Sequence, residues 1–109
     1  MKAAVCALAG VSAAVVLAVP AHADVDTDFA NRLHGYGIYG PRDYNAWIGK
    51  LTCKRLFNDV DHDAFDSAAF VGKNIHGSDT EQAWQFVGSA VSVYCPEKLA
   101  VLQQAGGSR

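Results

Sequence analysis

Residues 78–96, SDTEQAWQFVGSAVSVYCP, carry the strongest helix signal in the chain and decide the fold. Ser78 and Glu81 stand three positions apart before an apolar run, which is the spacing of a capping box, so we expect a helix over residues 79–94. Pro96 prevents that helix from continuing. The apolar side chains recur every three to four positions, as one helix face requires: Ala83, Trp84, Val87, Ala90, Val91 and Tyr94.

Apolar spacing upstream of this segment predicts three more helices. The first is short and ends at Gly35 and Gly37, the second begins at Tyr44 after turn residues, and the third follows the acidic run 58–63. A helical turn or two is expected after the fourth helix, with residues 105–109 frayed. Period-two alternation typical of strands is missing from the sequence. The predicted fold class is therefore all-α, a small four-helix domain.

The amino-terminal residues have the layout of a cleavable signal peptide. Lys2 gives a positive start, residues 3–19 form an uncharged apolar run, and residues 21–23 (AHA) match an A-x-A cleavage motif. The apolar run is short and rich in small residues, which fits a signal peptide better than a membrane anchor. We expect residues 1–23 to be removed, and residues 24–109 to form one secreted or cell-envelope domain with no stable membrane span.

Two of the three cysteines, Cys53 and Cys95, lie in the expected mature domain, and Cys6 leaves with the signal peptide. In a small exported domain, two cysteines form a disulfide more often than a catalytic or metal-binding pair. We therefore predict a disulfide between the second and fourth helices. In the chain-entropy account, closing a loop of this length stabilises the fold by about 4 kcal/mol.

Charge argues against a nucleic-acid partner. The chain has a formal net charge of −2, and loss of Lys2 makes the mature domain more negative. The one local basic group is Lys50, Lys54 and Arg55. Because phosphate binding requires a clustered positive surface, we expect no binding to nucleic acid.

The carboxy-terminal part of the predicted fourth helix is similar to a known family. Residues 86–96, FVGSAVSVYCP, together with residues 26–29 (DTDF), Leu33, Gly37 and Ile38, resemble the actinobacterial secreted domain of unknown function 732. The resemblance covers nearly all of residues 24–109. It implies a small secreted helical domain with one disulfide between Cys53 and Cys95, and no established activity.

Residues 59–63, DVDHD, resemble the start of a calcium-binding loop. An EF-hand requires Gly at the sixth loop position and Glu at the twelfth, where this chain has Ala64 and Phe70. Carboxylates at a helix start also cap amide groups and complement the helix dipole. We favour this capping role, with weak divalent binding as the alternative.

Three histidines and one tyrosine are candidate ligands of haem or a metal ion: His34, His62, His76 and Tyr36. His34 and Tyr36 are two positions apart and face different sides of a helix, so they do not form a typical ligand pair. Histidines near helix carboxyl ends also satisfy late carbonyl groups, a role open to His34 and His76. We predict no bound cofactor.

Catalytic signals are weak. The sequence contains no G-x-S-x-G motif, and a disulfide would leave the mature domain without a free thiol. We therefore predict that the protein is not an enzyme.

The aromatic content of the expected mature domain is high, and some of these rings are expected to be exposed at a hydrophobic recognition surface: Tyr39, Tyr44, Trp47, Phe57, Phe70, Trp84 and Phe86.

The leading functional interpretation is a non-catalytic secreted or cell-envelope binding module, whose partner is an unknown protein or a small hydrophobic ligand. A carrier of haem or lipid is the alternative, with aromatic residues between helices holding the ligand. A hydrolase is the third possibility.

Overall fold

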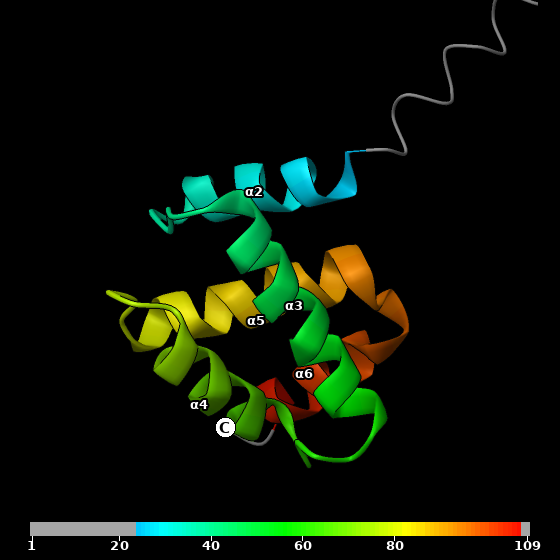
Figure 1. Cartoon of the computed structure of the whole chain (residues 1–109). Helices are drawn as coiled ribbons and strands as arrows, with labels where there is room; N and C mark the ends of the chain where they lie inside the picture. The colour runs from blue at the N-terminus through cyan, green and yellow to red at the C-terminus, as the bar shows by residue number, and fades with distance from the viewer. Residues whose placement is uncertain (1–23, 108–109) are drawn as a thin grey trace, which may run out of the picture.

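Helix α5 (Thr80–Tyr94) runs through the middle of the protein and packs against every other helix in the part of the chain that the structure describes, residues 24–107. In this computed structural model, α2 (Val25–Gly35) lies on one side of α5, while α4 (Ala64–Asn74) and α6 (Leu99–Gly107) lie on the other (Figure 1). Helix α3 (Arg42–Phe57) crosses α5 and contacts both α2 and α4. The arrangement confirms the all-α fold class. The predicted signal peptide lies outside the described residues.

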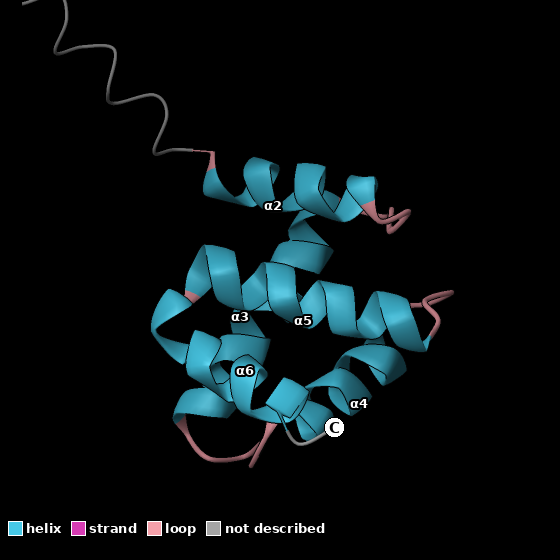
Figure 2. Cartoon of the chain, turned by 180° about the vertical axis from the view of Figure 1, so that it is seen from behind, coloured by secondary structure: helices cyan, strands magenta, loops and turns pink. Residues whose placement is uncertain are grey.

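The expected number of helices was wrong, because a fifth α-helix follows α5. After Cys95 the chain forms a single 3₁₀ turn, η1 (Pro96–Lys98), and then enters α6. Viewed from behind, α6 lies beside α4 and α5 (Figure 2). Val101 and Leu102 pack against the core, and Ala105 is buried. These contacts extend the one or two expected helical turns into a full helix, which includes Ala105, a residue expected to be frayed.

Helix α2 ends at the glycine turn that the sequence predicted. Gly37 follows α2 with φ +80°, and the amides of Gly37 and Ile38 donate to the carbonyl oxygens of His34 and Leu33 at 3.0 Å each. This is a Schellman motif, in which glycine takes the left-handed position without a Cβ clash. Buried Ile38 adds the apolar contact that accompanies such a turn.

A capping box does begin α5, one residue later than the sequence suggested. Asp79 Oδ1 accepts from the Gln82 amide at 2.7 Å, and Gln82 Oε1 accepts from the Asp79 amide at 3.1 Å. The Ser78 hydroxyl instead donates to the carbonyl oxygen of Ile75 at 2.8 Å and closes the preceding turn. The predicted pair, Ser78 and Glu81, is shifted by one residue from the observed pair, Asp79 and Gln82. Because the Ser78 hydroxyl bonds to Ile75 at the end of α4, Asp79 caps α5 instead.

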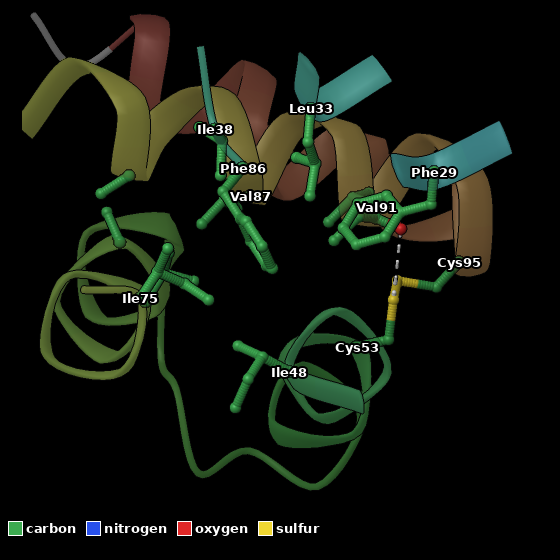
Figure 3. Packing of buried hydrophobic residues seen from close by; sticks show 14 of the residues in the cluster. Phe29, Leu33, Ile38, Ile48, Cys53, Ile75, Phe86, Val87, Val91 and Cys95 are labelled. Atoms are coloured by element: carbon green, nitrogen blue, oxygen red, sulfur yellow. Dashed lines mark hydrogen bonds between the residues drawn. A yellow bond between two sulfur atoms is a disulfide. The ribbon is translucent and has the colours of Figure 1, made fainter. Parts of the chain in front are cut away.

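The core is built from side chains of α2, α3, α4 and α5 that point toward one another (Figure 3). Phe29 of α2 lies edge-on to Phe86 of α5, with ring centroids 5.2 Å apart, and both rings are fully buried. Burying a side chain of this size contributes about 1.5–3 kcal/mol. Other fully buried apolar side chains are Leu33, Ile48, Val71, Val87 and Val91.

The predicted disulfide is present. Cys53 of α3 is bonded to Cys95 at the end of α5, with an S–S distance of 2.04 Å and Cα atoms 6.0 Å apart (Figure 3). Both cysteines are buried. A disulfide of this kind points to an oxidising, extracytoplasmic location. Within residues 24–107 no helix is long and apolar enough to cross a membrane.

Candidate aromatic binding site

Five aromatic or imidazole side chains gather where the α2–α3 loop, the start of α3 and the end of α4 meet. We name this set the aromatic strip: His34, Tyr39, Tyr44, Trp47 and His76. The His34 and Tyr39 ring centroids are 5.0 Å apart, and those of Tyr44 and Trp47 are 5.8 Å apart. Tyr39, Tyr44 and His76 border the same cavity, which joins the two ring pairs. Tyr39, Trp47 and Tyr44 are 67%, 56% and 37% exposed.

The backbone and neighbouring side chains hold the strip in place. Gly40 has φ +119°, a conformation that favours glycine, and it turns the chain into α3. The buried Asn45 side chain donates from Nδ2 to the Tyr39 carbonyl oxygen at 3.4 Å. The Tyr44 hydroxyl donates to the Asn74 carbonyl oxygen at 2.7 Å, which ties α3 to the end of α4.

Two hollows flank the strip, and both are lined by Tyr39, Ile75 and His76. The larger has a volume of about 150 Å³ and the smaller about 40 Å³. Neither lining contains Asp, Glu, Lys or Arg. The larger hollow is completed by Gly40, Pro41, Tyr44 and Asn45, and the smaller by Gly37, Ile38, Gly77, Ser78 and Gln82.

A separate groove of about 390 Å³ lies between α4 and the start of α5. Four of its nine lining residues are Ala or Gly, and the rings of Phe65 and Trp84 meet edge-on at its border with centroids 5.1 Å apart. No histidine lines this groove. The polar residues that line it come from the α4–α5 turn and the first position of α5: Ser78, Asp79 and Thr80.

The candidate haem or metal ligands are dispersed. His34 and His76 both border Tyr39, whereas His62 lies in the α3–α4 loop, where its amide donates to Asp66 Oδ2 at 3.0 Å. The Tyr36 side chain is exposed, and its carbonyl oxygen accepts from Gln82 Nε2 at 3.1 Å. Among the described residues, no three His, Cys, Asp or Glu side chains are grouped to hold a metal ion. The ligand roles of these four residues stay predictions.

The acidic run before α4 divides into two structural roles. Asp63 accepts from the Asp66 amide at 3.0 Å and caps α4, as the favoured interpretation expected. Asp61 is buried and accepts from Arg55 Nη2 at 2.8 Å and from the Ser67 hydroxyl at 3.0 Å. No local pattern predicts this ion pair, because Arg55 and Asp61 meet only after α3 turns into the following loop.

A second polar contact that sequence reasoning missed joins α2 to α5. The Tyr94 hydroxyl donates to Asp26 Oδ1 at 2.7 Å, and Lys50 Nζ lies 3.2 Å from Asp26 Oδ2. The Tyr94 hydrogen bond holds the pKa of the Asp26 carboxyl below its usual value; Lys50 adds to this effect and partial burial opposes it. Burial and the neighbouring carboxylate raise the pKa of Tyr94.

Comparison with known proteins places these features in a family. The sequence profile described as "Protein of unknown function (DUF732)" matches residues 23–97. The chain is 53% identical over 96 residues to the uncharacterized protein Rv0559c of Mycobacterium tuberculosis strain H37Rv, which covers 86% of each chain. The uncharacterized protein MT0585 of strain CDC 1551 matches with the same identity and coverage. No solved structure matches the chain.

Proposed function

The chain belongs to the DUF732 family of proteins of unknown function, and from this premise we propose that it is a non-catalytic binding module of the extracytoplasmic space. Its binding surface is the aromatic strip. The proposal includes removal of residues 1–23, which have the composition of a signal peptide, and release or envelope retention of the helical domain.

The observation that carries this proposal is the exposure of connected aromatic rings. Tyr39 and Trp47 leave more than half of their surface in water. Single exposed aromatic residues are common, but connected ones mark recognition surfaces. Tyr and Trp also dominate binding hot spots, because each buries a large area with few rotatable bonds.

The scaffold beneath the strip favours binding by a preformed surface. The Tyr44–Asn74 and Asn45–Tyr39 hydrogen bonds restrain the two segments that carry the rings. A disulfide joins α3, which presents Tyr44 and Trp47, to the central helix α5. Surfaces ordered before binding lose less conformational entropy when a partner arrives, so affinity is higher for a given contact area.

Co-sedimentation with cell-envelope fragments of the producing organism tests the proposal. Oxidised protein comprising residues 24–109 should sediment with the fragments, and the double variant Tyr39→Ala and Trp47→Ala should stay in the supernatant. Phe57→Ala is the matched control, since Phe57 is 51% exposed but lies under Lys98, away from the strip. Equal sedimentation of all three proteins, or of none, would reject the strip as the binding surface.

A carrier of a small apolar ligand is the second candidate, and the groove between α4 and α5 favours it. Its volume of about 390 Å³ falls within the range of small-molecule sites, and its apolar lining is made of Ala68, Ala69, Gly72 and Ala83 with the rings of Phe65 and Trp84. Oleate or haemin should quench or shift Trp84 fluorescence in a Trp47→Phe background. Ala69→Phe, at an exposed position in the groove, should block that change. An unaltered spectrum at saturating ligand would exclude this function.

A further inference from the structure

We propose that the aromatic strip binds a neutral carbohydrate chain, with one sugar ring seated in the cavity of about 150 Å³ between Tyr39 and Tyr44. This inference rests on the proposed function and names the ligand class of the same site. Three properties of the cavity support it: the lack of charged residues in its lining, its aromatic walls and the Asn45 amide.

The absence of charge selects a neutral ligand. No Asp, Glu, Lys or Arg lines either hollow of the strip. The nearest charged residues in the sequence, Arg42 and Asp43, pair with each other at 2.8 Å, and Arg42 also donates to Thr27. A phosphate, sulfate or carboxylate ligand would require a cation at the site. A cationic ligand would require a carboxylate there.

The walls match the apolar faces of a sugar. A pyranose or furanose ring exposes C–H groups on one face, and these groups pack against the electron-rich face of an aromatic ring. Tyr39 and Tyr44 border the cavity, and Trp47 extends the surface beyond Tyr44. Buried Ile75 completes the apolar lining. The site therefore offers ring-stacking surfaces for consecutive units of a chain.

Asn45 supplies a polar group where a hydroxyl would lie. The Asn45 side chain is buried, with only 4% of the residue exposed, and it lines the cavity. Its Nδ2 donates to the Tyr39 carbonyl oxygen, and its Oδ1 is the acceptor end of the same amide. A neutral amide oxygen accepts a hydrogen bond from a sugar hydroxyl. His76, on the same wall, offers a further donor or acceptor.

The size and shape of the cavity favour a sugar over two other ligands that bind aromatic surfaces. A volume of about 150 Å³ is below that of drug-sized sites, which suits one ring of a longer chain. An extended peptide would require hydrogen-bonding groups repeated along a groove, whereas Asn45 is a single buried group at one point. A protein that binds a membrane surface presents a flat apolar face, whereas here the rings border a hollow.

Affinity electrophoresis tests the inference with the oxidised protein comprising residues 24–109. Gels contain dextran, mannan, galactan or arabinan as neutral probes, and alginate as an acidic probe. The protein should be retarded by at least one neutral polysaccharide and not by alginate. Tyr39→Ala and Trp47→Ala should each weaken retardation about tenfold, the loss that corresponds to one aromatic contact. Phe57→Ala should migrate as the wild type.

Asn45→Leu provides a second readout at the buried group. It keeps a similar volume but removes the amide oxygen that would accept from a sugar hydroxyl, so retardation should fall even where circular dichroism shows a folded protein. Retardation by alginate as strong as by neutral chains would overturn the inference. Retardation by none of the neutral polysaccharides, or an equal loss in Phe57→Ala, would also overturn it.

Treated envelope fragments separate this inference from the proposed function. Periodate cleaves vicinal diols of sugars, so it should abolish co-sedimentation, whereas protease digestion or solvent extraction of the fragments should leave it intact. Binding lost only after protease digestion would identify a protein partner and reject the carbohydrate. Binding lost only after solvent extraction would identify a lipid. In both cases the strip would remain a binding surface. Absence of co-sedimentation before any treatment would instead reject the proposed function.

Discussion

Asp26 links the start of α2 to the end of α5 through one hydrogen bond from Tyr94 and an ion pair with Lys50. Asp26 lies in the first turn of α2, where acidic residues often cap a helix, but the N-cap position is Asp24 and no side chain caps this helix. The carboxylate instead accepts from groups that are 24 and 68 positions away. The partners of Asp26, Tyr94 and Lys50, are therefore set by the packing of the helices and not by neighbours in the sequence.

The stability that Tyr94 contributes through Asp26 should depend on pH. Because the folded pKa of Asp26 is lowered, this contribution is fully present above the unfolded pKa of about 3.9 and is lost as pH falls through the folded pKa. Tyr94→Phe should cost about 1 kcal/mol at pH 6, and the difference from wild type should shrink at pH 2.5, as urea unfolding would measure. Tyr36→Phe, at an exposed site, is the control. A pH-independent difference would contradict the assignment.

The Arg55–Asp61 pair predicts an asymmetric response to mutation. The Asp61 side chain is 1% exposed and that of Arg55 is 32% exposed. Arg55→Leu leaves a carboxylate buried without its cation and should cost about 3–5 kcal/mol. Asp61→Asn keeps the Ser67 hydrogen bond and leaves a guanidinium that reaches water, so it should cost about 1–2 kcal/mol. Chemical unfolding gives both values, and a greater loss in Asp61→Asn would refute this account.

At the level of the helices, two glycines occupy interior positions for different reasons. A Cβ added to Gly49 of α3 would lie 2.9 Å from Phe29 and 3.1 Å from Tyr94, so glycine lets α2, α3 and α5 meet closely. A Cβ added to Gly88 of α5 would have no atom within 4 Å. Only the first glycine is required by packing.

Alanine substitutions at these two positions should therefore act in opposite directions. Gly49→Ala should destabilise the fold by about 1–3 kcal/mol, because the ring of Phe29 or Tyr94 has to move. Gly88→Ala should stabilise it by about 0.4–1 kcal/mol, because alanine restricts the unfolded chain and favours helix. Thermal unfolding of the two variants beside wild type checks the signs. Destabilisation of similar size in both would mean that helix propensity does not control Gly88.

Across the whole molecule, the disulfide connects two helices whose cysteines are 42 positions apart in sequence. In the chain-entropy account, a disulfide that closes a loop of this length contributes about 4 kcal/mol to the free energy of unfolding. This is a large part of the total stability of a small domain. Replacing Cys53 and Cys95 with Ala should lower the urea midpoint strongly or unfold the domain at 37 °C. A reducing agent should have the same effect on wild type and none on the double variant. An unchanged midpoint in the variant would show that helix packing alone sustains the fold.

Local signals in the sequence were sufficient for the all-α class, four of the five described helices and the cysteine pair. Apolar spacing, glycine stops and Pro96 act within a few residues, so they operate in any surroundings. Only a helical turn or two was expected where α6 forms, because its full length depends on contacts with α4 and α5. The position of the α5 capping box was missed because Ser78 closes the turn after α4 instead.

The aromatic strip shows the same division for the candidate site. Its tyrosines and Trp47 were predicted to be in part exposed, and His34 and His76 were already candidate ligands. Their grouping was not predicted, since the strip draws on α2, a loop, α3 and the end of α4. Helical periodicity specifies which way a side chain faces on its own helix. The crossing of helices, which depends on close packing at Phe29 and Gly49, places those faces beside one another.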